Sequence, residues 1–238
     1  ADALNHTLAT LAPEQRPLAV ELALARDWID RGPLTLLRPE ETRYYALRFP
    51  LAHRSEVDRH ARRNGLDRGL VYGLIRAESA WVTAARSSAD ARGLMQMLPG
   101  TARRMAKLER LPFAGPNDLY RPPLSIALGT RYLAEGLAQW GARAWVTAAA
   151  YNAGPAPVRR WLDARGGLPP DLWIETIPYR ETREYVSRVL AFATLYDWRL
   201  GDRLQRVSTR IGLDGGATTP ATVACTTAPG GNPQAGNP

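Results

Sequence analysis

The chain has 238 residues and a formal net charge of +8; 45% of its residues are hydrophobic and 23% are charged. This composition predicts a water-soluble globular protein, and no apolar run approaches the roughly 18 residues that a membrane-spanning helix needs. The single cysteine, Cys225, excludes an intrachain disulfide and a thiolate metal site. The first residues lack the charged and apolar segments of a signal peptide, so we expect any export signal to have been removed or to lie upstream.

Arginine supplies all but one of the basic residues, the exception being Lys107. A basic balance suits a polyanionic partner such as a nucleic acid, an anionic membrane surface or a cell-wall polymer. The arginines occur as scattered pairs, for example Arg62 with Arg63, and no nucleic-acid-binding motif is present, so we expect no nucleic-acid partner. Solvated helix faces would explain the arginines equally well.

Residues 1–65 predict a small helical module. Its clearest feature is an amphipathic stripe made of Leu18, Leu22, Ala25, Trp28 and Ile29. An apolar stripe must pack against something, so we expect this module to lean on the rest of the chain or on a preceding region.

A second helix is predicted to begin after Asp67, whose side chain can cap it, and to carry one acidic residue on its apolar face. The residues that share this face at three- and four-residue spacings are Leu70, Val71, Leu74, Ile75 and Glu78. Burial and the negative end of the helix dipole both favour the neutral form of Glu78, which is the form that a general acid needs near neutral pH. The structural alternative is that Glu78 only caps the helix or pairs with an arginine.

The chain from residue 66 to residue 205 is predicted to form a helical domain, and we find no convincing two-residue alternation. Further helices are expected to begin at Pro99 and to span 124–140, 142–152, 156–165 and 181–200. Residues 206–238 are rich in Pro, Gly and Thr and predict a disordered tail. The predicted fold class is therefore all-α, with a small N-terminal helical module before the main domain.

Several short motifs are more specific than the helical pattern that contains them. In chain order they are Glu78-Ser79, Ser87, Gly93-Leu94-Met95-Gln96 with Pro99, Ala150-Tyr151-Asn152-Ala153-Gly154, Glu175-Thr176-Ile177-Pro178-Tyr179, Glu181-Thr182-Arg183 and Tyr185-Val186. Over residues 66–200 they resemble the catalytic domain of the soluble lytic transglycosylases. Residues 1–65 resemble more loosely the helical linker module that precedes this domain in the larger members, so the chain is similar to the C-terminal part of such an enzyme.

The resemblance implies a goose-lysozyme-like helical domain that cleaves the β-1,4 bond between N-acetylmuramic acid and N-acetylglucosamine in peptidoglycan glycan strands. Cleavage in this family proceeds without water and leaves a 1,6-anhydro end, and Glu78 matches the family's acid and base. Most glycosidases need two carboxylates, but one suffices if the sugar's own N-acetyl oxygen stabilises the developing cation and its own C6 hydroxyl attacks. The resemblance also implies a periplasmic enzyme that needs neither a metal nor an organic cofactor.

Three residues that follow Glu78 in the chain, Ser87, Met95 and Gln96, match family positions around the reacting sugar. Ser87 would orient the N-acetyl group, and its alternative is a hydroxyl that only closes a loop turn. Gln96 offers an amide to sugar groups, while Met95 offers either a soft apolar wall or plain core filling. Gly93 in the same motif permits close approach of the backbone.

Three later residues complete the predicted substrate-binding set. Tyr151 ends an alanine-rich helix, where its phenol can hold the substrate or Glu78, and spacing alone would favour a core tyrosine. Asn152 belongs to the same motif. Glu175 matches a second family acid in the cleft, with sugar binding favoured over chemistry; its alternative is a charge at a helix start.

The loop before the Gly93 motif departs from the family pattern. Asp90 stands where the family usually has glycine, and Ser88 stands where it usually has proline. A second carboxylate at Asp90 could position water and make the protein a goose-type muramidase that hydrolyses the same bond. A further alternative is a non-catalytic cell-wall-binding module that uses its basic surface for docking.

Overall fold

Helices make up the architecture of the residues that the computed structural model describes, which are 10–26, 36 and 38–213. In chain order they are α2 (Gln15–Ala25), η2 (Pro39–Glu41), α3 (Tyr45–Arg48), α4 (Arg54–Arg63), α5 (Arg68–Ser79), α6 (Pro99–Glu109), η3 (Pro116–Tyr120), α7 (Pro122–Gln139), α8 (Ala144–Ala153), α9 (Pro155–Arg165), α10 (Pro170–Glu175), α11 (Arg180–Leu200) and α12 (Val207–Arg210). Within these ranges there is no β-strand, only isolated bridges from Arg92 to Arg86 and to Met97, which confirms the all-α prediction. None of the described helices is long and apolar enough to cross a membrane.

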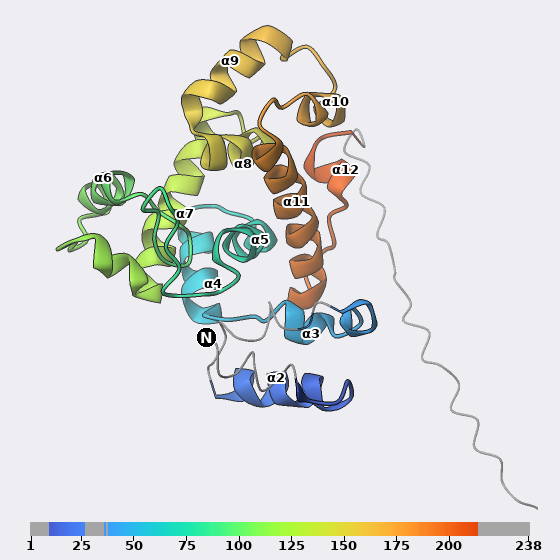
Figure 1. The fold of residues 1–238 in the computed structure, drawn as a ribbon. Helices are drawn as coiled ribbons and strands as arrows, with labels where there is room; N and C mark the ends of the chain where they lie inside the picture. Colours follow the sequence, from blue (N-terminus) through green and yellow to red (C-terminus); the bar gives the residue numbers. More distant parts are fainter. Residues whose placement is uncertain (1–9, 27–35, 37, 214–238) are drawn as a thin grey trace, which may run out of the picture.

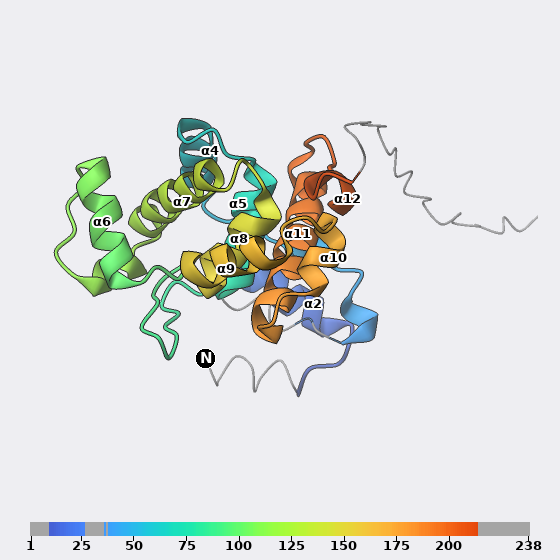
Figure 2. The ribbon, with the colours of Figure 1, turned by 90° about the horizontal axis from the view of Figure 1, so that it is seen from above.

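Helix α5 lies at the centre of the fold and pairs most extensively with α11 (Figure 1). Helices α4, α7 and α8 lie around this pair, and α6 lies on the far side of α7 in both views (Figure 2). Gly73 permits the close approach of α5 to α11. A Cβ atom at Gly73 would lie 2.6 Å from the backbone nitrogen of Ala193 and 2.9 Å from the carbonyl oxygen of Val189. The helix that carries Glu78 therefore packs directly on the backbone of α11.

The main hydrophobic core runs from Phe49 to Ile211 and encloses α5. An aromatic cluster joins α5 and the residues just after it to α11 within this core. Tyr72 stacks on Tyr196 with ring centroids 4.9 Å apart, and the indole Nε1 of Trp81 donates a 2.9 Å hydrogen bond to the Tyr196 hydroxyl. Phe49 makes an edge contact with the same tyrosine, with ring centroids 5.6 Å apart. The position of the α5 terminus is therefore fixed by buried rings from two other parts of the chain.

A second, smaller hydrophobic cluster lies in residues 10–48. Its buried members are Val20 and Leu36. A buried ion pair supports the cluster, with Arg16 Nε 2.5 Å from Glu41 Oε1. This segment therefore has a small core of its own beside the main one.

The predicted apolar stripe of the N-terminal module is wrong in its described part. Leu18 and Leu22 are 65% and 55% exposed, and α2 instead buries a different face that includes Val20. Trp28 and Ile29 lie outside the described residues. The helix was predicted correctly, but its buried face was not.

Helix α4 contributes to the main core, although its residues fall within the predicted 1–65 module. Val57 and Ala61 are fully buried, and α4 packs on α5 and α7. The two hydrophobic clusters therefore meet just before Phe49, whereas the sequence placed the boundary at residue 65.

The predicted tail, residues 206–238, begins with a folded segment. Helix α12 carries Arg210, whose guanidinium lies 2.6 Å from an Asp197 oxygen and 3.3 Å from an Asp67 oxygen. The Arg210 and Asp197 side chains are almost fully buried. The prediction of disorder is therefore wrong for α12, and residues 214–238 lie outside the described residues.

Candidate active site

Helix α5 places Glu78 in its last turn. Asp67 caps the start of the helix as predicted, since its Oδ1 accepts a 2.6 Å hydrogen bond from the backbone N–H of Leu70. The helix ends because Ala80 and Trp81 adopt left-handed backbone conformations, with φ of 49° and 71°. Trp81 is fully buried, so the end of the helix is anchored in the core and the position of Glu78 in the last turn is fixed.

The Glu78 carboxyl lies on the predicted apolar face and is itself partly buried. The other members of that face are all buried: Leu70, Val71, Leu74 and Ile75. Its Oε1 accepts a hydrogen bond of 2.5 Å from the hydroxyl of Tyr185, which lies on α11. The two helices at the centre of the fold thus each supply one member of a carboxyl–phenol pair.

The environment of Glu78 raises its pKa to about 7. Burial is the largest cause, because removal from water penalises the charged carboxylate. The Tyr185 hydrogen bond opposes it by stabilising the carboxylate, the nearby Glu181 charge raises the pKa further, and the Arg188 charge lowers it. Glu78 can therefore hold a proton near neutral pH and also release it there.

Tyr185 is the functional residue that the sequence reading missed. The sequence shows it in the Tyr185-Val186 motif within the helix predicted at 181–200, with no role assigned to its hydroxyl. The useful signal was that Glu181 and Tyr185 are four residues apart on one helix face, both within a motif that accompanies Glu78. Both residues interact with Glu78 in the structure.

Glu78 opens onto a cleft of about 570 Å³. The cleft brings Glu78 together with two of the predicted binding residues, Ser87 and Gln96. The full lining is Arg76, Ala77, Glu78, Ser79, Ala80, Val82, Ala85, Arg86, Ser87, Gln96, Arg188 and Phe192. One carboxyl of raised pKa thus faces a solvent-accessible space whose walls combine apolar side chains with polar and charged groups.

The loop between α5 and α6 is closed by its own polar side chains. The Ser87 hydroxyl accepts a 3.1 Å hydrogen bond from the backbone N–H of Ala91, which is the loop-closing role that the sequence left open. The Gln96 amide nitrogen donates to the carbonyl oxygens of Ala85 at 3.1 Å and Gly93 at 2.8 Å. Ser87 nevertheless stays exposed and Gln96 is only partly buried, so both still face the cleft.

The first three residues of the Gly93 motif are buried in the core, whereas Gln96 at its end lines the cleft. A Cβ atom at Gly93 would lie 1.9 Å from the carbonyl oxygen of Leu119, and its φ is 75°, so only glycine fits there. Met95 is 0% exposed and packs against Gly129, where a Cβ atom would lie 2.4 Å from its sulfur. The prediction that Met95 forms a wall for the substrate is therefore wrong, and the core-filling alternative is correct.

Asp90 lies outside the lining of the Glu78 cleft, and two arginines bind its carboxylate. Its Oδ1 accepts from Arg86 Nε at 2.6 Å and from Arg92 Nε at 3.0 Å, and its Oδ2 accepts from Arg92 Nη2 at 3.1 Å. The hydrogen bond from Arg86 is the main reason that its pKa lies below the ordinary value. Asp90 is also not part of the cleft lining, so nothing in this geometry favours it as a base for water.

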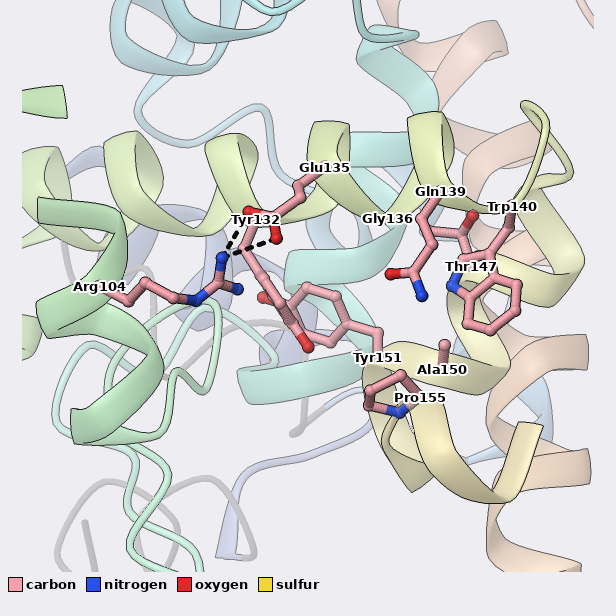
Figure 3. Close-up of a pocket in the computed structure, with 10 residues that line it drawn as sticks. All are labelled: Arg104, Tyr132, Glu135, Gly136, Gln139, Trp140, Thr147, Ala150, Tyr151 and Pro155. Carbon is pink, nitrogen blue, oxygen red and sulfur yellow. Dashed lines mark hydrogen bonds and ion pairs between the residues drawn. The ribbon is translucent and has the colours of Figure 1, made fainter. Parts of the chain in front are cut away.

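Tyr151 lies in a second, smaller hollow of about 170 Å³ (Figure 3). Its ring lies 5.2 Å from that of Tyr132, and Arg104 Nη1 binds both oxygens of Glu135 at 2.6 and 2.9 Å on the same wall. The lining is Arg104, Tyr132, Glu135, Gly136, Gln139, Trp140, Thr147, Ala150, Tyr151 and Pro155. This hollow combines flat aromatic surface with amide, carboxylate and guanidinium groups.

The Tyr151 hydroxyl donates to the carbonyl oxygen of Met95 at 2.8 Å. Burial is the main reason that the pKa of Tyr151 lies well above its ordinary value, and the Glu78 charge adds to the shift. Tyr151 is therefore within electrostatic reach of Glu78, but the phenol that binds Glu78 is that of Tyr185.

The last two predicted binding residues, Asn152 and Glu175, lie outside the lining of both hollows. The Asn152 side-chain oxygen accepts a 2.6 Å hydrogen bond from the Thr182 hydroxyl, which ties α8 to the first turn of α11. Glu175 is exposed at the end of α10, not at a helix start, and its backbone carbonyl accepts from Arg183 at 2.9 Å. Glu175 lines neither of the two hollows.

The described residues contain no group of His, Cys, Asp and Glu side chains with the spacing of a metal site. The chemistry that this arrangement offers is proton transfer by Glu78, supported by a phenol that can stabilise the carboxylate after the proton has left.

Comparison with known families and structures agrees with the motifs. The family model described as "Transglycosylase SLT domain" matches residues 56–174, and the model described as "Soluble lytic transglycosylase helical domain" matches residues 176–204. The soluble lytic murein transglycosylases of Salmonella typhimurium and Escherichia coli K12 are 35% and 34% identical to this chain over 192 residues. Those residues make up 80% of this chain and 30% of each relative.

Solved structures show the same relation. The 70 kDa soluble lytic transglycosylase of Escherichia coli superposes with a TM-score of 0.77 at 31% identity, over 84% of this chain and 33% of that chain. The lytic transglycosylase Slt of Pseudomonas aeruginosa, solved as an inactive Glu-to-Gln mutant, gives a TM-score of 0.75 at 34% identity, over 85% and 33%. This chain spans about a third of the length of these relatives. Since the first family model covers half of the chain and the structural similarity extends beyond it, the chain belongs to the family defined by the transglycosylase SLT domain.

Proposed function

We propose that this protein is a peptidoglycan lytic transglycosylase in which Glu78 is the single acid and base. The observation that carries the proposal is the Glu78 carboxyl in an open cleft, with a pKa of about 7 and a 2.5 Å hydrogen bond from Tyr185. Family membership supports the reaction class, and with it the proposed substrate, the bond between N-acetylmuramic acid and N-acetylglucosamine. It also supports a periplasmic location.

The proposed reaction begins with protonated Glu78. Its proton passes to the oxygen that links the two sugars, and the bond from that oxygen to the muramyl C1 breaks. The muramyl N-acetyl oxygen stabilises the positive charge at C1, while Tyr185 stabilises the new Glu78 carboxylate by its hydrogen bond. The carboxylate then takes the proton of the muramyl C6 hydroxyl, and the oxygen of that hydroxyl bonds to C1. Glu78 is protonated again at the end, and the product is a 1,6-anhydro sugar.

Substrate binding is proposed to use both hollows. Ser87 and Gln96 lie in the cleft with Glu78, where their polar groups can bind the N-acetyl group and ring hydroxyls. The hollow at Tyr151 offers the neighbouring rings of Tyr132 and Tyr151, tilted by 53° to each other, and Gln139 to a neighbouring sugar, because aromatic side chains combine apolar faces with polar edges. A strand that occupies both would place one of its glycosidic bonds at Glu78.

The test is the Glu78→Gln variant assayed on purified peptidoglycan. We expect release of muropeptides to fall by at least about 100-fold, the usual contribution of a general acid, with an unchanged circular dichroism spectrum. Glu184→Gln is the matched control, since it removes an exposed carboxylate of α11 that forms its ion pair with Arg180 and lines neither hollow. Its activity should equal that of the wild type.

Mass spectrometry of the products identifies the reaction. Anhydro ends are expected, and products heavier by one water would replace the proposal with hydrolysis. Full activity of Glu78→Gln would refute the assignment of the acid.

A further inference from the structure

The cleft at Glu78 is lined by more positive than negative charge. Three arginines face it, Arg76, Arg86 and Arg188, and Glu78 is the only carboxyl in the lining. A glycan ring has no charge, so contact with the sugars alone does not require these cations. The side arm that a muramyl residue carries on its C3 oxygen does bear carboxylates.

Arg76 has a structural role in this lining. It is buried, and its guanidinium stacks on the rings of Phe49 and Phe192 at 5.6 and 5.3 Å from their centroids. Its Nε also donates to the carbonyl oxygen of Arg48 at 3.3 Å. Arg76 therefore closes the floor of the cleft.

Arg86 belongs to a loop cluster with a surplus of positive charge. Its Nε binds Asp90 at 2.6 Å, and the same carboxylate binds Arg92 at 2.9 Å. Two guanidinium groups share one carboxylate, so the cluster carries a net charge of +1. Arg86 is the member that faces the cleft, and its side chain is more than half exposed.

Arg188 stands out because the described part of the chain supplies no ion pair or hydrogen bond to its guanidinium. It is exposed, three residues after Tyr185 on α11, and it lines the same cleft. Its charge lowers the pKa of Glu78, which works against the protonated acid that the reaction needs. A bound anion would neutralise this effect while the substrate is in place.

We propose that Arg188, assisted by Arg86, is an anion-binding site that recognises carboxylates on the muramyl side arm of the glycan strand. The guanidinium group suits this ligand, because its planar donors match a carboxylate in two parallel hydrogen bonds. The inference rests on the proposed function and adds a specificity to it: strands with free carboxylates are better substrates than strands whose carboxylates are blocked.

The experiment compares soluble peptidoglycan strands before and after conversion of their carboxylates to amides. We expect the wild-type kcat/KM to be roughly tenfold higher on the native strands, since a charge-assisted hydrogen bond contributes at least that factor. Arg188→Gln should lower kcat/KM on native strands by a similar factor and leave the rate on amidated strands within about twofold. Arg188→Lys keeps the charge and should retain part of the preference.

Arg160→Gln is the matched control. It removes an arginine on α9 that is also exposed but lines neither hollow, and it changes the net charge by the same amount. It should keep the full preference for native strands. A preference that persists in Arg188→Gln, or an equal loss on both substrates, would overturn the inference while leaving the proposed function intact.

Two further arms complete the test. Peptide removal takes away the peptide carboxylates and frees the lactyl carboxyl from its amide bond, so peptide-free strands test the lactyl carboxylate alone. A loss of the Arg188-dependent rate on these strands assigns the ligand to the peptide, and a rate that Arg188→Gln still lowers shows that a lactyl carboxylate also binds. A wild-type protein that cleaves neither native nor amidated strands would refute the proposed function itself, and the inference with it.

Discussion

At the scale of single residues, Glu78 is governed by two opposing influences. Burial disfavours its charged form, and the Tyr185 hydroxyl favours that form. An acid that must later act as a base needs both, because a carboxyl that is only buried would not release its proton near neutral pH. The 2.5 Å hydrogen bond and the pKa of about 7 describe the resulting balance.

Removing the Tyr185 hydroxyl should shift this balance in a known direction. In Tyr185→Phe the carboxylate loses its donor, so the pKa of Glu78 rises further and the acid stays protonated to higher pH. The descending limb of the pH–rate profile should move to higher pH, and kcat at the optimum should fall by up to roughly tenfold, as for a lost hydrogen bond. Phe192→Leu, at the cleft wall, serves as control and should leave the limb in place. An unmoved limb in Tyr185→Phe would contradict the role assigned to this phenol.

The raised pKa of Glu78 also links stability to pH. The carboxyl binds its proton more tightly in the folded state, with a pKa of about 7, than in the unfolded chain, where the reference value is 4.5. The free energy of unfolding should therefore fall as the pH rises from 4.5 to 7, by up to about 3 kcal/mol. Glu78→Gln lacks this titration, so its advantage over the wild type should grow from pH 4.5 to pH 8. Urea unfolding at pH 4.5 and pH 8 measures the difference in free energy of unfolding between the two proteins. A difference that does not change with pH would argue against a buried acid.

The site residues show what a sequence pattern can and cannot predict. Glu78 was found because its position on an apolar face follows from helix geometry alone. The sequence leaves Met95 open between a substrate wall and core filling and assigns no role to Tyr185, because only tertiary packing decides what each side chain contacts. Met95 is enclosed against Gly129, while Tyr185 is buried with its hydroxyl directed at Glu78.

At the scale of helices, the site depends on how closely α5 and α11 approach. Gly73 lies at their crossing, where any side chain would meet the backbone of α11. The starts and ends of these helices could be predicted from local signals such as the Asp67 cap, which act within a few residues. The buried face of α2 could not, because its partner residue Leu36 lies in a different segment.

Gly73→Ala tests the helix crossing. The new methyl group would lie 2.6 Å from the Ala193 nitrogen, so the helices must separate, and we expect a loss of about 1–3 kcal/mol in the free energy of unfolding. Gly100→Ala is the matched control, since a Cβ atom there meets nothing within 4 Å. It should lie within about 1 kcal/mol of the wild type. Thermal unfolding of both variants measures the difference, and equal melting temperatures would exclude tight packing at Gly73.

At the scale of the whole molecule, one buried charge network joins distant parts of the chain. Arg210 on α12 binds Asp67, which caps α5, and Asp197 on α11. The Asp197 carboxylate also accepts a 2.9 Å hydrogen bond from the backbone N–H of Gln205. The sequence did not predict this contact. Helix α12 is too short to give a clear helical pattern, and the residues that follow it are rich in Gly and Pro.

Arg210→Ala should be among the most destabilising single changes in the chain. It leaves the nearly inaccessible Asp197 carboxylate without its cation, and the loss should be about 3–5 kcal/mol. Arg206→Ala removes an exposed arginine four residues earlier and should change stability by less than about 0.5 kcal/mol. Adding Asp197→Asn to Arg210→Ala should restore part of the loss, because no buried charge then remains unpaired. If the two alanine variants unfold alike in urea, the network does not stabilise the fold.

The separation of Glu78 and Tyr185 in the chain has a consequence for the timing of activity. The two residues are 107 positions apart, so a growing polypeptide contains Glu78 long before the helix that covers it has been synthesised. Until α11 docks, the carboxyl faces water and has the acidity of an ordinary glutamate, which is ionised at neutral pH. An unfinished or unfolded chain therefore lacks the raised pKa that the proposed reaction needs, and Glu78 acquires it only when α11 docks on α5.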